Sequence, residues 1–130
     1  PKRGVQNDSK WAHGTHVAGI LGAVTDNGIG MASAMFNGKI LSVKCSMDGP
    51  DTTEPLIHRG YDGITYAAKA GFDAGMRTII NTSWGGQGIT TSEKIVIDIA
   101  FNNYGAIIVA AAGNGAEDRQ GASLFSAPHR

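Results

Sequence analysis

Apolar residues recur along this chain in two rhythms, and together they predict three helices and three strands. A spacing of three or four residues predicts amphipathic helices over residues 13–24, 54–70 and 91–104. The apolar positions of the first are Val17, Ile20, Leu21 and Val24. The second has an apolar face formed by Ile57, Gly60, Ile64, Ala67 and Ala68, and the third by Ile95, Val96, Ile99 and Ala100. Threonine or serine side chains are predicted to cap the second and third helices, with Thr52 or Thr53 at the second.

Short runs rich in β-branched and small apolar residues predict strands over residues 39–45, 78–82 and 106–112. The last run is apolar without interruption, which is typical of a strand buried on both faces. Strands that alternate with helices predict an α/β fold with a parallel sheet and helices on both faces. In such sheets ligands bind beyond the carboxyl ends of the strands. Glycine-rich loops follow Thr82 and Ala112, so we expect a site there.

Composition narrows the function without naming it. The 130 residues carry 11 basic and 11 acidic side chains with no basic cluster, so nucleic acid and anionic membranes are not expected partners. No apolar run approaches the ~20 residues that span a bilayer. Nucleotide-binding glycine motifs are absent after the predicted strands. Glycine, at 19 residues, is about twice as frequent as usual, which suits loops that hold ligands by their main chain.

The densest candidate chemistry is the sequence His-Gly-Thr-His-Val-Ala-Gly at residues 13–19. It places His13 at the start of a predicted helix. A helix N-terminus disfavours a positive charge, so an imidazole there is expected to remain neutral and able to act as a base. A histidine that merely packs at a helix end is the alternative, but chance is a poor explanation for two histidines within this frame.

This segment resembles the histidine motif of the subtilisin-like serine peptidases, the subtilases. The resemblance implies that His13 is the general base and that His16 supports packing. Residues 80–86, Ile-Asn-Thr-Ser-Trp-Gly-Gly, are similar to the substrate-binding strand and loop of that family. By this match Ser83, Trp84 and Gly85 pair with an extended substrate, and Ser83 is not the nucleophile, because no Gly-x-Ser-x-Gly turn surrounds it.

Residues 109–115, Val-Ala-Ala-Ala-Gly-Asn-Gly, resemble the strand and loop that carry the oxyanion asparagine in subtilases. The resemblance implies that Asn114 is that residue, a neutral amide donor for the negative charge of the tetrahedral intermediate. Ala111, Ala112 and Gly113 would then form the second wall of the primary specificity pocket. Taken alone, an Asn-Gly turn after a buried strand is the alternative. Three motifs in the family's order make it remote.

The order of a subtilase triad is aspartate, histidine, serine. By resemblance the aspartate would precede Pro1 and the serine would follow Arg130. We therefore expect residues 1–130 to be the central part of a single subtilisin-like peptidase domain, incomplete at both ends and inactive by itself. Its expected partners are a peptide or protein substrate, the remaining segments of the domain and a propeptide. Family resemblance alone predicts that it is secreted. The alternative is an inactive subtilase-like fragment or peptide-binding module.

The loop after the first predicted helix raises a metal question. Residues 25–31, Thr-Asp-Asn-Gly-Ile-Gly-Met, resemble the calcium-binding loop of many subtilases. The resemblance implies a structural calcium ion held by Thr25, Asn27, Ile29 and Met31. The chain departs from the family pattern just afterwards, at Ser33 and Phe36. No cofactor is expected for the chemistry itself.

Overall fold

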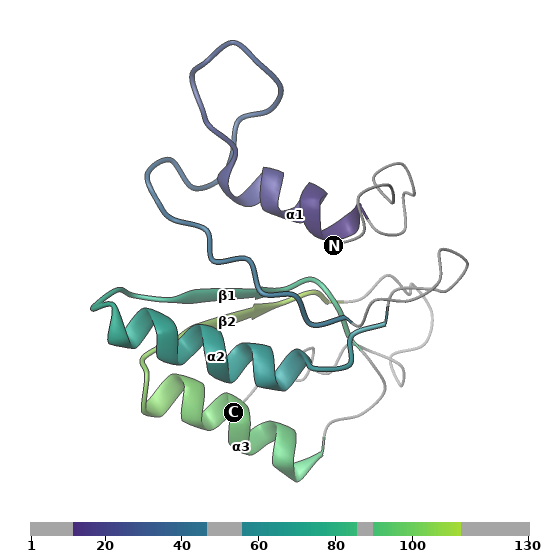
Figure 1. The fold of residues 1–130 in the computed structure, drawn as a ribbon, viewed down its shortest axis with the longest axis vertical. Helices are drawn as coiled ribbons and strands as arrows, with labels where there is room; N and C mark the ends of the chain where they lie inside the picture. Colours follow the sequence, from purple (N-terminus) through teal and green to yellow (C-terminus); the bar gives the residue numbers. More distant parts are fainter. Residues whose placement is uncertain (1–11, 47–55, 86–89, 113–130) are drawn as a thin grey trace. The chain divides into compact units, whose positions relative to one another are not determined.

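A computed structural model of the chain describes residues 12–46, 56–85 and 90–112. In this part of the chain the helices and strands are, in order, α1 (His13–Gly22), α2 (Gly60–Asp73), β1 (Ile79–Thr82), α3 (Thr91–Asn102) and β2 (Ile107–Ala110). Figure 1 shows them along the chain. The chain divides into two compact units, residues 1–56 and 57–130.

The first unit contains α1 and the segment that follows it. The helix ends at Gly22, two residues before the predicted end, because Ala23 takes an extended conformation with ψ 150°. The chain then returns to the helix, and the amide nitrogens of Ala34 and Met35 donate to the carbonyl oxygens of Ile20 and Leu21. Gly22 leaves room for side chains of the returning segment, since a Cβ there would lie 2.5 Å from Ile40 Cδ1 and 3.0 Å from Met35 Cε.

The strand predicted over residues 39–45 is wrong for this structure, in which these residues are not assigned to a strand. Ile40 and Leu41 are 44% and 52% exposed. Their side chains suit a strand, but a strand also requires a hydrogen-bonded neighbour, which local composition cannot supply.

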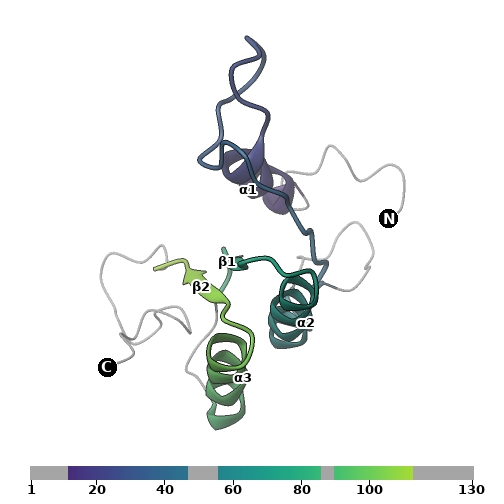
Figure 2. The same ribbon diagram turned by 90° about the vertical axis from the view of Figure 1, so that its left-hand side faces the viewer.

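The second unit is a parallel two-stranded sheet with two helices. Ile79 pairs with Ile107 and Thr82 with Ala110, so β1 and β2 run in the same direction with α3 between them in the chain. Figure 2 shows α2 and α3 side by side along the sheet. Their contact surrounds a small core of buried residues, formed by Ile64, Ala68, Ala100 and Ala106. Partly buried Ile80 and Ile108 pack against this core from the strands.

The second predicted helix is displaced toward the C-terminus. It begins at Gly60, after an N-cap residue, Arg59, that makes no side-chain cap, and it ends at Asp73. Ile57 therefore lies before the helix and is 43% exposed, while the proposed caps at residues 52 and 53 lie outside the described residues. The chain turns away at Gly75, whose φ of 67° allows Met76 N to donate back to Gly71 O.

The third predicted helix is confirmed closely at its start. Thr90 is the N-cap, and its hydroxyl accepts from Glu93 N while its own amide donates to the Glu93 carboxylate. Its apolar face differs from the prediction. Ile97 and Ala100 are buried, but Ile95 is 52% exposed, because the many apolar residues in this short helix left more than one choice of face.

The strand predicted over residues 106–112 exists as β2, but it is not buried on both faces. Ile107 and Val109 are about half exposed, and Ile79 on β1 lies on the same face. Both helices of this unit cover the opposite face, on which Ile80 and Ile108 lie. The predicted class, α/β with a parallel sheet, is confirmed. That helices cover both faces of the sheet stays a prediction, because α2 and α3 lie on one face in this unit. That residues 1–130 belong to a single domain stays a prediction.

Candidate functional site

The carboxyl ends of β1 and β2 are joined by two hydrogen bonds. The Thr82 hydroxyl, on a residue only 1% exposed, donates to Val109 O across 3.2 Å. Ala111 N donates to Thr82 O, also at 3.2 Å. The two segments predicted to line the substrate pocket, residues 83–85 and 111–113, therefore begin side by side, as far as Ala112.

The first of these segments leaves the sheet at Ser83. The Ser83 hydroxyl, half-buried, accepts a hydrogen bond from Asn81 Nδ2 at 2.8 Å. Gly85 is exposed, so its backbone is open to a ligand. A side chain held by its own strand and followed by an open backbone suits a segment that pairs with an extended peptide.

Trp84 points into the second unit and is half-buried against its core. Its ring meets Tyr61 edge-on, with centroids 5.9 Å apart and planes at 83°. Gly60 is buried directly beneath the indole. Neither Gly60 nor Tyr61 was predicted to belong to the site.

The second segment continues β2 with Ala111 and Ala112, both of which are exposed. Gly113 and Asn114 follow at once in the chain but lie outside the described residues. The structure therefore places the strand end that leads to the proposed oxyanion donor, and the position of Asn114 stays a prediction.

His13 is the first residue of α1, as predicted, and its side chain is exposed. The helix is entered from Ala12, whose carbonyl oxygen accepts from His16 N at 3.0 Å. His13 belongs to the first unit and the strand ends belong to the second.

The loop after α1 carries the four predicted calcium ligands. Residues 26–32 line an open hollow of about 180 Å³. The Asn27 side-chain oxygen accepts from Ile29 N at 3.0 Å. Gly28 and Gly30, with φ of 68° and 67°, allow the tight path, and Asp26 adopts φ 57°. Thr25 is half-buried just before the hollow.

The Subtilase family, Peptidase S8, matches residues 1–130, which is the whole of the sequence. The chain belongs to the subtilase family.

Several named proteases are similar to this chain. It is 39% identical over 103 residues to the thermophilic serine proteinase of Bacillus sp. strain AK1, covering 78% of this chain and 23% of that protein. It is 35% identical over 120 residues to the extracellular basic protease of Dichelobacter nodosus, covering 85% and 18%. With thermitase of Thermoactinomyces vulgaris it shares 36% over 102 residues, covering 78% and 33%. The chain thus spans about a third or less of these relatives, and no solved structure matches it.

The subtilase motifs that the sequence predicted are distributed over both units of the structure. Residues 83–85 and 111–112 are brought together by the sheet, whereas Thr82, which joins them, was missed. The sequence could have indicated the role of Thr82, because a threonine at the end of a strand can both fill space and donate a hydrogen bond across the sheet.

No helix in the described segments is long and apolar enough to cross a membrane.

The loop after α1 of this subtilase offers oxygen ligands of the types that calcium binds. Calcium binds carbonyl and amide oxygens and takes six or more of them. Asn27 retains acceptor capacity beyond its bond to Ile29, since an amide oxygen has two lone pairs. No cluster of three His, Cys, Asp or Glu side chains occurs within residues 12–46, 56–85 or 90–112, so carbonyl groups would supply most of the ligands.

Proposed function

We propose that this chain is the central part of the catalytic domain of a serine endopeptidase and that it supplies most of the substrate cleft. The observation that carries the proposal is the hydrogen-bonded junction at the ends of β1 and β2. This junction sets the start of residues 83–85 next to Ala111, which supports the proposal that the two segments form two walls of a peptide-binding cleft. Family membership supports the reaction class.

His13 is proposed as the general base. Its imidazole takes the proton of a serine hydroxyl while the serine oxygen attacks the scissile carbonyl carbon, and it then gives that proton to the leaving amine. An aspartate orients the imidazole and stabilises its charged form. The aspartate and serine are proposed to come from the rest of the domain. In the second half of the reaction, His13 takes a proton from a water molecule as the water oxygen attacks the acyl carbon. It then returns that proton to the serine oxygen, which leaves as the free hydroxyl.

Asn114 is proposed as the donor that stabilises the oxyanion. The negative charge appears on the former carbonyl oxygen, and a neutral amide can meet it without a proton to lose. It follows the exposed residues Ala111 and Ala112 after only one further residue, Gly113. The hydrogen bond from Ala111 N to Thr82 O holds the strand end that leads to this donor.

The substrate is proposed to bind in an extended conformation along Ser83, Trp84 and Gly85, with Ala111, Ala112 and Gly113 on the other side of its side chain. An extended peptide gains affinity from main-chain hydrogen bonds to an exposed edge. The exposure of Gly85, Ala111 and Ala112 supports this placement. Partners beyond the substrate are proposed to be the remaining segments of the domain and a propeptide.

Two further features follow from the family and are part of the proposal. A calcium ion, when bound, would fix the loop after α1, held by the carbonyl oxygens of Thr25, Ile29 and Met31 and by the Asn27 amide. Secretion is proposed because two relatives, from Dichelobacter nodosus and Xanthomonas campestris, are named extracellular proteases.

The test is hydrolysis of a peptide anilide by the full-length protein that contains this chain. His13→Ala is expected to abolish activity, whereas His16→Ala, a matched change one turn later on α1, is expected to leave measurable activity. Cleavage that survives His13→Ala would refute the proposed role. Peptide binding without any cleavage by the full-length protein would favour the binding module instead.

The chain of residues 1–130 alone is proposed to be inactive, since the proposed nucleophile is supplied by the rest of the domain. Hydrolysis of the same anilide by the purified 130-residue chain, abolished by His13→Ala, would overturn this part of the proposal.

A further inference from the structure

The indole of Trp84 lies in space that a side chain at position 60 would otherwise occupy. A Cβ built on Gly60 would come within 2.6 Å of Trp84 Cη2 and 2.8 Å of Cζ2, closer than such atoms approach. Gly60 is itself buried at the first residue of α2. A tryptophan side chain has two rotatable bonds and a rigid ring, so the whole indole must turn to make room for a side chain at position 60.

The neighbouring residue holds the same ring from the side. Tyr61 meets Trp84 in an edge-to-face contact, the arrangement that aromatic quadrupoles favour. Its hydroxyl oxygen is buried, and burial, with a smaller contribution from the Glu93 carboxylate, raises the pKa of that hydroxyl to about 12. Both rings also pack against the core that contains Ile64 and Ala68.

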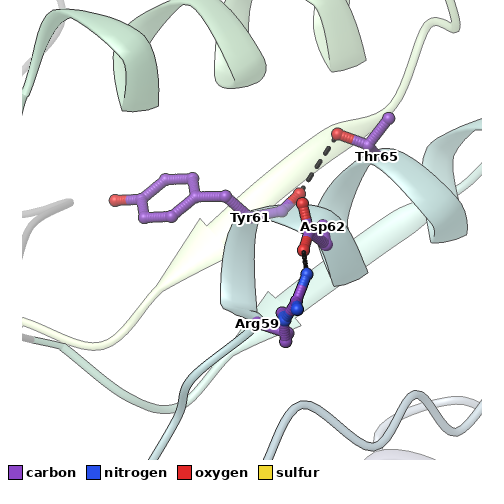
Figure 3. A network of polar contacts seen from close by, with 4 residues as sticks. All are labelled: Arg59, Tyr61, Asp62 and Thr65. Carbon is purple, nitrogen blue, oxygen red and sulfur yellow. Dashed lines mark hydrogen bonds and ion pairs between the residues drawn. The ribbon is translucent and has the colours of Figure 1, made fainter.

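The backbone that presents Gly60 and Tyr61 is braced within its own turn. Arg59 Nη1 lies 3.0 Å from a carboxylate oxygen of Asp62, and the Thr65 hydroxyl donates to Tyr61 O at 3.1 Å. Figure 3 shows the Tyr61 ring projecting away from the Arg59–Asp62 pair. The ion pair is exposed and contributes little to stability, so the contact of Tyr61 with the indole does not depend on it.

We propose that Gly60 and Tyr61 are positioning residues that fix the Trp84 indole and, through it, the substrate-pairing backbone of residues 83–85. This inference rests on the proposed function, because it assigns to α2 a role in the substrate cleft. Trp84 is the middle residue of the segment, with Ser83 held by Asn81 on one side and Gly85 open on the other. Its ring is therefore the anchor that sets the direction of the open end.

The contact between position 60 and Trp84 has one consequence for kinetics and one for the sizes of the two residues. Pairing with an extended peptide is made in the ground state as well as in the transition state, so disturbing it raises KM more than it lowers kcat. The size relation between positions 60 and 84 is also reciprocal. A larger residue at 60 requires a smaller one at 84.

The experiment uses the full-length protein and a peptide anilide long enough to pair with residues 83–85. Gly60→Ala is expected to raise KM about tenfold with kcat within about twofold. Adding Trp84→Leu is expected to recover part of that loss, because the smaller side chain makes room although it gives up the ring contact with Tyr61. Gly71→Ala is the matched control on the same helix. A Cβ there would collide with Thr78 rather than Trp84, so this variant is expected to lose stability without a rise in KM.

A second variant and a second measurement keep the test decisive if Gly60→Ala fails to fold. Tyr61→Leu removes the ring contact without adding bulk near Trp84 and is expected to raise KM about threefold, whereas the exposed Tyr66→Leu is expected to leave KM unchanged. The indole N–H resonance of Trp84 in an NMR spectrum is expected to shift in both Gly60→Ala and Tyr61→Leu.

An unchanged KM together with an unchanged indole resonance in these variants would overturn the inference, as would a double variant no better than Gly60→Ala alone. Hydrolysis that does not depend on His13 would instead refute the proposed function. In that case the indole resonance alone decides whether Gly60 and Tyr61 anchor Trp84.

Discussion

The hydroxyl of Thr82 donates a hydrogen bond to the carbonyl oxygen of Val109 across the sheet, at 3.2 Å. Thr82 is the buried last residue of β1, and Val109 lies next to the last residue of β2. The bond adds a side-chain tie to a two-stranded ladder at the very place where the segments of the proposed cleft begin. It connects the stability of the sheet to the geometry of the site.

Replacing Thr82 by valine keeps the shape and removes the donor. We expect Thr82→Val to lower the free energy of unfolding by about 1 kcal/mol, the usual net value of such a bond, and to raise KM because the strand ends separate more easily. Urea unfolding of the full-length protein and anilide kinetics measure both. Thr91→Val is the control, since Thr91 is exposed at the first residue of α3, away from the strand ends. Equal effects of the two changes on KM would contradict the coupling.

The core of the second unit is small, so each of its large side chains matters. Ile64 is 2% exposed and lies at the contact of α2 with α3 and the sheet. Ile64→Ala is expected to cost about 2–5 kcal/mol of unfolding free energy, because it removes buried methyl groups and leaves a cavity. Ile95→Ala, at a half-exposed site on α3, is expected to cost clearly less. Thermal or urea denaturation would show the order, and a reversed order would be evidence against this core.

Removing the proposed oxyanion donor tests the chemistry separately from the fold. Asn114→Ala is expected to lower kcat about 10²–10³-fold with little change in KM, the loss known for the oxyanion asparagine of subtilisin, a member of the same family. Asn103→Ala, at the exposed end of α3, is the control. Steady-state kinetics decide the matter, and a loss confined to KM would point to substrate binding instead.

The Tyr61 hydroxyl predicts a dependence of stability on alkaline pH. Its pKa is about 12 in the folded chain and 10.0 as the ordinary value, so unfolded chains lose this proton first as pH rises. The stabilisation is therefore complete below about pH 10 and is lost as pH rises from about 10 toward 12. Tyr61→Phe is expected to flatten that part of the profile of unfolding free energy against pH. The control Tyr66→Phe, at an exposed site, should leave it as steep as in the wild type.

Features that depend on neighbouring residues in the chain were predicted well. The capped start of α3 needs only Thr90 and Glu93, three residues apart, and the sequence shows both. The strand at residues 79–82 and its glycine-rich exit were likewise predicted from local pattern and motif. The sequence also predicted that residues 83–85 and 111–112 begin at the same edge of the sheet, because parallel strands end at the same edge. That they share a substrate site stays a prediction.

Features that depend on distant partners were predicted less well. Residues 39–45 have the side chains of a strand but are not assigned to one. Whether such a segment pairs with another strand depends on distant residues, which the local sequence does not show. Whether Ile107 is buried depends on which face of the sheet the helices cover. The fit of Gly60 to Trp84 joins a helix start to a loop, and no periodic pattern relates the two positions.

The parallel pairing of β1 with β2 also has a consequence for how fast the second unit forms. Thr82 and Val109 are 27 residues apart, so the ladder must close a long loop before any of its hydrogen bonds can form. Helix α3 lies within that loop, and its capping box can form from neighbouring residues alone, in about a microsecond. When α3 is already formed, the flexible loop that must close before β1 and β2 can pair is effectively shorter. The folding rate of this unit is therefore expected to depend on Thr90 and Glu93 although neither residue touches the sheet's hydrogen bonds.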